Sequence, residues 1–277
     1  MAIIQCSFAS TSLKRQVSFT ALLPGDAMFP TPGCDGPFKT LYLLHGYTEG
    51  AMARFKSSDI GDISQENNLA IIMPNGENHF YVNDIETQDM YSDFIGRELV
   101  EFTRRVFPLS REREDTIIGG ISMGGFGALI NGMRFHDTFG HIVAISPALI
   151  KDELKTASDV PNHVGSTRGF FESVFGELES YDESDMNPAF LAARLRREGA
   201  EFPSIYLACG RNDMLCAPAR ELHRELESLG VRHRYVEGPG THEPIFFYPH
   251  LRHGLSFIAL DRPPSAPNPF WVDETHS

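Results

Sequence analysis

This sequence contains a series of apolar segments separated by helical patterns, and this series limits the folds that the chain can adopt. Six such segments are KTLYLLHG, LAIIMPNG, DTIIGGIS, HIVAISPAL, SIYLACG and HRYVEGPG, which begin at positions 39, 69, 115, 141, 204 and 233. Most of them are apolar without alternation, as strands buried on both faces are. Strands of this kind that alternate with helices predict an α/β fold with a mostly parallel central sheet and right-handed crossovers.

Two further segments near the N-terminus, CSFAS at 6–10 and RQVSFTALLP at 15–24, alternate polar and apolar residues. This alternation is typical of half-exposed antiparallel strands, and it brings the expected sheet to about eight strands. Helices are expected to flank this sheet. Their patterns lie at 91–107, 123–135, 217–230 and 249–260.

The length of 277 residues fits one large α/β domain, which we place at 1–261. Residues 262–277 are rich in proline and polar side chains, and we expect them to form an extended tail. The connection at about 150–200 is long, and such insertions are often functional. Two interpretations stay open: a lid or cap over a site, or a crossover decorated with a short helix that Asn187 caps and Pro188 starts.

The formal net charge of −13 argues against partners with negatively charged surfaces. We therefore expect no nucleic acid and no membrane among the partners, and no apolar segment reaches membrane-spanning length. The four cysteines show neither C-x-x-C spacing nor a cluster with histidines, so we expect reduced thiols and no metal site. The N-terminal segment lacks the features of a signal peptide, which favours a cytoplasmic protein.

The segment IIGGISMGGFGA at 117–128 surrounds a single serine, Ser122, with glycines. Gly120 and Gly124 complete the motif G-x-S-x-G, which here lies between a predicted strand and a predicted helix. In this motif the serine sits on a sharp, strained turn, and larger side chains at the two glycine positions would collide. The turn also points the positive end of a helix at the serine. A glycine-rich packing turn is the alternative, but the flanking strand and helix favour a nucleophile.

A nucleophilic serine needs a base, and the base needs a carboxylate that fixes its tautomer. With this motif the expected chain order is serine, acid, histidine, each just beyond a strand. Asp213 follows one late strand and His242 follows the last, so we expect these two residues to complete a triad with Ser122. Asp213 could instead cap the next helix. The other histidines nearby precede the last strand or belong to the last helix, and they are His233, His250 and His253.

The negative charge of the reaction intermediate needs two hydrogen-bond donors. We expect one to be the backbone N–H of Met123, directly after the serine. The other is expected from the loop after an early strand, and our choice is the backbone N–H of Tyr47. Gly46 keeps that loop small enough for close approach. His45 precedes the serine in the chain, so we expect its side chain to support the loop rather than to act as the base.

Several blocks of the sequence occur in an order that resembles the esterase D-like branch of the α/β-hydrolases, and within it the bacterial tributyrin esterases. They are LYLLHGYTEG, IIMPNG, GGISMGGFGALINGMRFHDTFGHIVAISPAL, FGE, CGRNDML and GTHEPIFF, and the resemblance covers about residues 5–260. It implies the α/β-hydrolase fold, a serine carboxylesterase that acts on short acyl esters without a cofactor, and a homo-oligomer. It also implies the same functional residues that were chosen above from their places after the predicted strands, namely Ser122, Asp213, His242, Tyr47 and Met123.

Two regions depart from the pattern of these esterases. Related esterases often carry a tryptophan after the His-Gly loop and a Trp-Tyr pair after the fourth strand, whereas this chain reads TEGAMARFKSS and NHFYVND there. We expect Phe80 and Tyr81 to replace the pair as an aromatic wall of the substrate pocket. A cysteine-containing stretch of S-formylglutathione hydrolases is also missing from the sequence.

The sequence therefore predicts a serine carboxylesterase that hydrolyses short-chain, small-molecule esters through an acyl-enzyme intermediate. The same triad suits an S-formylglutathione-type thioesterase, a feruloyl or acetyl esterase, or an acyltransferase with an acceptor other than water. A catalytically inactive binding protein on the same scaffold is the non-enzyme alternative. Such proteins commonly lose a member of the triad, and here all three are present.

Overall fold

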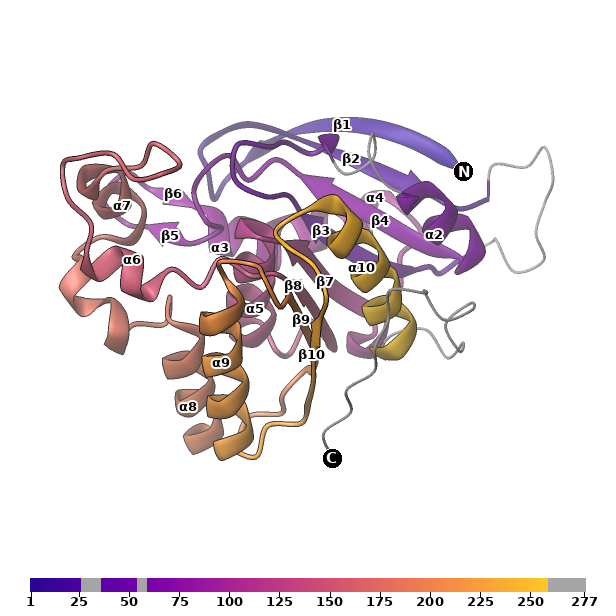
Figure 1. Ribbon diagram of the computed structural model, residues 1–277. Helices are drawn as coiled ribbons and strands as arrows, with labels where there is room; N and C mark the ends of the chain where they lie inside the picture. The colour runs from indigo at the N-terminus through magenta and orange to yellow at the C-terminus, as the bar shows by residue number, and fades with distance from the viewer. Residues whose placement is uncertain (26–35, 54–58, 259–277) are drawn as a thin grey trace.

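An eight-stranded sheet forms the centre of the computed structural model, which describes residues 1–25, 36–53 and 59–258 (Figure 1). The strands lie in the order β1-β2-β4-β3-β7-β8-β9-β10. The pairs β1–β2 and β2–β4 are antiparallel, and all other neighbours in this sheet are parallel. The predicted α/β-hydrolase fold with a mostly parallel sheet is confirmed. The strand bounds are β1 (Ala2–Ser10), β2 (Arg15–Leu23), β3 (Lys39–Leu44), β4 (Leu69–Pro74), β7 (Thr116–Ile121), β8 (His141–Ile145), β9 (Ser204–Gly210) and β10 (His233–Gly238).

Burial along each strand follows the position of the strand in the sheet. Every residue of β4, β7 and β8 is buried, because helices cover both faces of the central strands. The edge strand β1 alternates between half-buried and exposed residues over most of its length. In β3, alternate side chains enter two separate cores, since Tyr42 and Leu44 belong to one buried cluster and Leu41 and Leu43 to another.

The helices divide between the two faces of the sheet in the same way. Buried side chains of α4 (Leu99–Val106), α5 (Met123–Arg134), α8 (Pro188–Glu198) and α9 (Cys216–Ser228) join the cluster that contains Tyr42. Those of α2 (Ile60–Glu66) and α10 (Pro244–Ile258) join the cluster that contains Leu41. Figure 1 shows α8 and α9 side by side, away from α10.

The four predicted helices are present with shifted bounds. The pattern at 91–107 is divided into α3 (Tyr91–Asp93), a π-helical turn (Phe94–Glu98) and α4. Within this turn Gly96 packs against the Phe135 ring, and a Cβ there would lie 2.0 Å from a ring carbon. The last helix, α10, begins at Pro244, before the predicted start at 249, and continues through Pro249.

The connection at 150–200 contains more structure than its sequence predicts. It carries α6 (Lys151–Lys155), α7 (Arg168–Phe175), a 3₁₀ turn (Leu178–Glu183) and α8. The expected helix start is present, since Asn187 Oδ1 accepts a hydrogen bond from the Ala189 N–H at 3.1 Å and Pro188 opens α8. Other short elements that the sequence analysis missed are α2, a 3₁₀ turn (Arg113–Asp115) and a hairpin of β5 (Asn83–Asp84) and β6 (Asp89–Met90).

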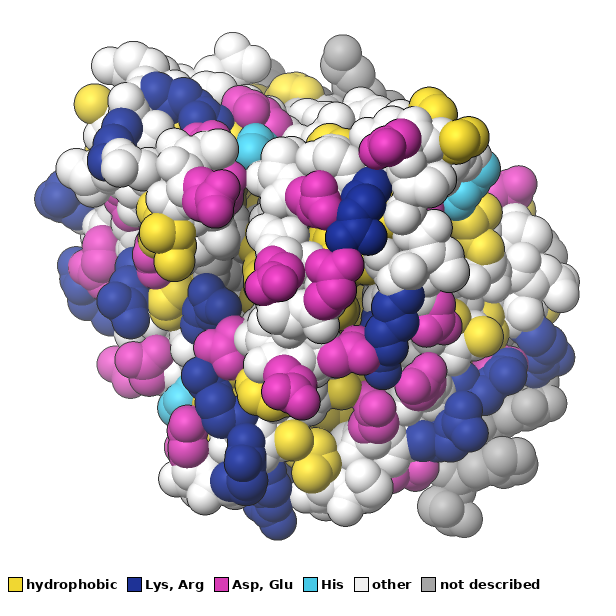
Figure 2. Space-filling view, turned by 90° about the vertical axis from the view of Figure 1, so that its left-hand side faces the viewer, with side chains coloured by type: hydrophobic (Ala, Val, Ile, Leu, Met, Phe, Trp, Pro, Cys, Tyr) yellow, Lys and Arg dark blue, Asp and Glu magenta, His cyan; other side chains and the backbone are white. Residues whose placement is uncertain are grey.

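The surface charges and the lengths of the helices relate to the predictions about membrane and nucleic-acid partners. Figure 2 shows the face that carries α6 and α7, where acidic and basic side chains are interspersed. None of the helices in the described part of the chain has the length and apolarity needed to cross a membrane. The predicted tail at 262–277 lies outside the described residues.

Gly132, on α5, tests how closely this helix packs on the sheet. A Cβ at this position would lie 2.4 Å from Cγ1 of Ile142 and 2.9 Å from Cγ2 of Ile118. Alanine normally favours a helix over glycine by about 1 kcal/mol. Here we expect Gly132→Ala to lower the free energy of unfolding by about 1–3 kcal/mol, because the strand side chains would be overpacked.

Urea unfolding measures this effect, with Gly169→Ala in α7 as the matched control. Nothing lies within 4 Å of a Cβ added at Gly169, so we expect this variant to be as stable as the wild type or more stable. If Gly132→Ala is as stable as the wild type or more stable, as expected for the control, α5 does not pack on the sheet as closely as described.

Candidate active site

The serine of the G-x-S-x-G motif lies on a sharp turn between β7 and α5. Ser122 has φ 59° and ψ −120°, a strained conformation for a residue with a side chain. The two glycines make the turn possible. A Cβ on Gly120 would lie 2.3 Å from the carbonyl of Gly124, and a Cβ on Gly124 would lie 2.2 Å from the Leu44 carbonyl oxygen. The turn leaves Ser122 half-buried at the carboxyl ends of the parallel strands.

The structure brings the three predicted triad residues together. His242 Nε2 lies 3.1 Å from Ser122 Oγ, and His242 Nδ1 lies 2.8 Å from Asp213 Oδ2. Since the ionised carboxylate can only accept, Nδ1 carries a proton and Nε2 is the nitrogen that can accept the serine proton. A hydrogen-bond chain therefore links the alcohol, the imidazole and the acid.

The acid of this chain is buried and ionised. The Asp213 side chain is fully buried, whereas the His242 side chain is 28% exposed. Burial alone would raise the pKa of Asp213, but hydrogen bonds from His242 and from the Leu215 N–H hold the pKa below its usual value. The Leu215 N–H donates to Asp213 Oδ1 at 2.9 Å, which leaves Oδ2 to the imidazole. A negative charge is thus fixed behind His242.

Backbone contacts hold the acid loop and the histidine loop against each other. The Arg211 N–H donates to the Gly238 carbonyl at 2.8 Å, and the Asn212 N–H donates to the Gly240 carbonyl at 2.9 Å. Gly240 has φ 150°, a conformation that residues with side chains rarely adopt. The ring of Phe247 packs edge to face on His242, with centroids 4.9 Å apart, and so restrains the imidazole.

The competing histidines are engaged elsewhere. His250 is buried and lies 3.3 Å from the Tyr206 hydroxyl, and burial lowers the pKa of His250 to about 4. His253 contacts the same hydroxyl at 3.2 Å. His233 Nε2 lies 2.8 Å from His223 Nδ1.

The two predicted oxyanion donors follow β7 and β3, which are neighbours in the sheet. Met123 is the first residue of α5, so its N–H has no carbonyl within the helix to bond to. Tyr47 lies in the loop after β3, and its N–H has no acceptor among the described residues. Both amides are therefore available to a bound ligand.

His45 supports the loop of Tyr47, as the sequence predicts. The Gly76 N–H donates to His45 Nε2 at 2.8 Å, so the His45 ring is protonated on Nδ1, which lies 2.8 Å from the Gly46 carbonyl oxygen. The Tyr81 hydroxyl donates to the His45 carbonyl at 2.9 Å. The Gly46 N–H donates to the carboxylate of Glu49 at 2.8 Å. These bonds fix the backbone on which the Tyr47 amide lies.

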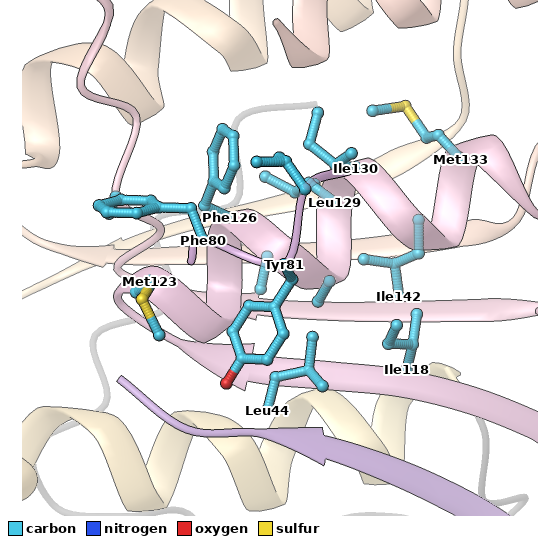
Figure 3. Close-up of a cluster of buried hydrophobic side chains, with 14 of the residues drawn as sticks. Leu44, Phe80, Tyr81, Ile118, Met123, Phe126, Leu129, Ile130, Met133 and Ile142 are labelled. Carbon is cyan, nitrogen blue, oxygen red and sulfur yellow. The ribbon is translucent and has the colours of Figure 1, made fainter. Parts of the chain in front are cut away.

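The two aromatic residues predicted to line the pocket point in different directions (Figure 3). Phe80 lines a cavity of about 190 Å³ beside Ser122 and packs on Phe126. Tyr81 is fully buried and is not among the described residues that line the cavity, and a Cβ on Gly127 would lie 2.4 Å from its ring. Both have positive φ, 49° and 59°, a strained arrangement that turns consecutive side chains to opposite sides. Phe80 thus faces the cavity, while Tyr81 supports the His45 loop.

Most of the remaining cavity wall was not predicted, and much of it comes from the 150–200 connection. The Tyr47 hydroxyl lies 3.1 Å from Ser166 Oγ, which links this connection to the loop after β3. The only sequence signal for these residues is the length of the connection. Besides Phe80, Tyr47, Ser122 and His242, the cavity is lined by Ala148, Ile150, Glu153, His163, Val164, Ser166, Phe171, Met214 and Leu215.

Comparisons with known proteins agree with a serine hydrolase site. The family described as putative esterase matches residues 10–258. The chain is 36% identical over 262 residues to an acetyl esterase of Caldicellulosiruptor saccharolyticus, an alignment that covers 94% of this chain and 98% of the relative.

Two solved structures from Staphylococcus aureus are also similar, and each alignment covers 93% of this chain and 98% of the other. The substrate-bound fluorophosphonate-binding serine hydrolase F has a TM-score of 0.82 and 25% identity. The S-formylglutathione hydrolase, solved as the apoenzyme, has a TM-score of 0.80 and 25% identity.

The lowered pKa of Asp213 makes part of the stability depend on pH. A carboxylate whose pKa is lower in the folded chain stabilises the fold above its ordinary pKa of about 3.9, and this contribution is lost as the pH falls towards the folded value. Asp213→Asn removes the titrating group. We expect wild type to be more stable than this variant at about pH 5 and the difference to shrink by about pH 3.

Chemical unfolding of both proteins at the two pH values measures this difference. Asp152→Asn, at a surface carboxylate of α6, is the control and should leave the pH dependence of the wild type unchanged. A stability difference between wild type and Asp213→Asn that stays constant from about pH 5 to about pH 3 would contradict the ionised, stabilised acid.

Proposed function

The chain belongs to the putative esterase family, and we propose that it hydrolyses esters of short acyl chains with Ser122 as nucleophile, His242 as general base and Asp213 as the orienting acid. That it is a serine-type carboxylic ester hydrolase follows from the family and from its serine hydrolase relatives. The observation that carries the residue assignment is the unbroken chain of hydrogen bonds from Ser122 Oγ through the imidazole to Asp213.

The proposed reaction begins when Ser122 Oγ attacks the ester carbonyl and His242 Nε2 takes its proton. The 3.1 Å contact between these atoms is within the reach that proton transfer requires. The developing imidazolium is stabilised by the buried Asp213 carboxylate, which stays ionised throughout. His242 then gives the proton to the leaving alcohol. Water repeats the sequence on the acyl-enzyme and releases the acid.

The backbone N–H groups of Met123 and Tyr47 are proposed to hold the oxyanion. Donors that are fixed in advance stabilise the transition state more than flexible ones, because no reorganisation is needed during the reaction. The bonds that hold His45 and Gly46 support this role for the Tyr47 loop. Each such donor contributes about 3–4 kcal/mol to transition-state stabilisation in serine hydrolases.

The size and lining of the cavity beside Ser122 support the proposal that the substrates are short and uncharged. It is small, about 190 Å³, and most of its wall is apolar. Among the described residues that line it, the ionisable side chains are Tyr47, Glu153, His163 and His242, and none is a lysine or arginine. A carboxylate at this place disfavours the anionic glutathione portion, the leaving thiol, of a glutathione thioester. The acetyl esterase relative and the resemblance to tributyrin esterases both favour short acyl groups, with acetyl esters as the first substrates to test.

The 150–200 connection is proposed to act as a cap that sets the size of this pocket. Its residues Ile150, Glu153, Ser166 and Phe171 form much of the wall, which supports this interpretation over a merely decorated crossover. A cytoplasmic location is supported by the free thiols of Cys6, Cys209 and Cys216, which suit a reducing compartment. The resemblance to tributyrin esterases supports a homo-oligomer.

Replacement of the nucleophile tests the assignment. We expect Ser122→Ala to fold normally and to lose about 10⁴-fold or more in kcat towards p-nitrophenyl acetate, because no acyl-enzyme can form. The control is Ser228→Ala, at an exposed serine of α9, which should keep wild-type activity. Circular dichroism verifies the fold of both variants. An active Ser122→Ala protein would refute the proposed nucleophile.

A series of p-nitrophenyl esters of increasing acyl length tests the pocket. We expect kcat/KM of the wild type to fall once the acyl chain exceeds the cavity. Ile150→Ala shortens a side chain of the wall and so enlarges the cavity. It should raise kcat/KM for the longer esters relative to the acetate, by up to about fourfold for each additional methylene that the cavity then holds.

The matched control for this series is Ile85→Ala, because Ile85 is 81% exposed and is not part of the cavity wall. It should leave the chain-length profile unchanged. If Ile150→Ala also leaves the profile unchanged, the acyl group does not bind in this cavity.

A further inference from the structure

Ser146, a residue that the triad does not include, lies directly after β8 in an unusual conformation. It has φ 42°, in the left-handed region, although it is not a glycine. Its side chain is fully buried, and its N–H donates to the Ala208 carbonyl of β9 at 2.7 Å. Non-glycine residues in this region cost free energy of order 1–3 kcal/mol and tend to cluster at functional sites. The serine hydroxyl thus lies in the interior, on a residue that is bonded to β9, the strand before the acid loop.

The segment that holds Ser146 also holds the nucleophile turn. The Ser122 N–H donates to the Ile145 carbonyl at 3.0 Å, and the Ala148 N–H donates to the Ser122 carbonyl at 2.9 Å. Residues 145–148 therefore lie between Ser122, on the turn after β7, and the loop after β9 that carries Asp213. A side chain from this segment is in a position to act on the acid without contacting the substrate.

The hydroxyl of Ser146 has no well-aligned hydrogen bond to another residue in the described part of the chain. Burial raises the pKa of both the Asp213 carboxylate and the Cys209 thiol, and the nearby Ser146 hydroxyl opposes this effect at each. The pKa of Cys209 stays raised, so this thiol is neutral and a weak acceptor. The carboxylate is ionised and has acceptor capacity left after Leu215 N–H and His242, since two oxygens offer about four sites.

We propose, on the basis of the proposed esterase function, that Ser146 is a positioning residue for ester hydrolysis: its hydroxyl donates to the Asp213 carboxylate and holds it in line with Nδ1 of His242. The positive φ at Ser146 is the conformation that brings the hydroxyl to this place. A third donor keeps the carboxylate ionised and limits its rotation, so the imidazole keeps the tautomer that the serine requires.

Titratable groups approach the acid from three elements. Cys209 lies near it at the end of β9, with Cys216 of α9 and Glu237 of β10 next to Cys209, and His242 bonds to it from the loop after β10. The charge of Glu237 is paired with Arg220 of α9 at 2.8 Å and with Arg211 of the acid loop at 3.7 Å. A change in pH dependence on removal of the Ser146 hydroxyl therefore reports on Asp213 and His242.

Two substitutions separate the hydroxyl from the backbone strain. Ser146→Ala removes the hydroxyl and keeps the strain, while Ser146→Gly removes both, because glycine adopts positive φ freely. We expect kcat/KM for p-nitrophenyl acetate to fall about tenfold in both variants, as for loss of a hydrogen bond to a charged group. The acid limb of the pH profile of kcat/KM should move to higher pH, because a carboxylate with fewer donors stabilises the imidazolium more strongly. The glycine variant should melt at the same temperature as the alanine variant or higher.

Wild-type kcat/KM and an unchanged pH profile in both variants would overturn the proposal. So would a loss of activity in Ser146→Ala that Ser146→Gly restores, because strain and packing would then explain it. A double-mutant cycle adds a further check: Ser146→Ala should have little additional effect in an Asp213→Asn background. Full activity of Asp213→Asn would instead refute the proposed triad, so failure of the two proposals can be told apart.

Discussion

The close approach of α5 to the ends of β3 and β7 is the constraint on which the active site depends. Because Gly120 and Gly124 carry no Cβ, the helix begins directly against the Leu44 carbonyl, and Ser122 is forced into its strained turn. The same contact sets the first N–H of the helix beside the loop after β3. The arrangement of the proposed nucleophile and oxyanion donors thus follows from one packing requirement.

The electrostatics of the site depend on how deeply each group is buried, from the enclosed acid to the serine at the cavity wall. The acid is fully enclosed, and donated hydrogen bonds keep it ionised where burial alone would favour its neutral form. The imidazole is partly exposed, and the serine lies at the wall of an apolar cavity. A fixed negative charge behind the ring and a poorly hydrated space in front of it both favour proton transfer from the serine. The strained residues Ser122 and Phe80 both line this space.

Sequence patterns predicted the parallel sheet and the positions of Ser122, Asp213 and His242 in chain order, because strand ends and turn glycines are local properties. The contact between these residues and the shape of the cavity are not local. Phe80 and Tyr81 could not be distinguished from the sequence, since their directions depend on two consecutive positive φ angles. The wall from Ile150 to Phe171 comes from short helices with weak periodicity. The role proposed for Ser146 has no sequence signal, because it rests on a backbone angle and on burial.

We infer that the hydrogen-bond chain from Asp213 through His242 makes Ser122 the reactive serine of this protein. Labelling with a fluorophosphonate, followed by proteolysis and mass spectrometry of the peptides, identifies the reactive serine. We expect one covalent adduct, on Ser122, and a much slower labelling of that residue when His242 is replaced by alanine. An adduct on another serine, or labelling of Ser122 at the same rate without His242, would contradict it.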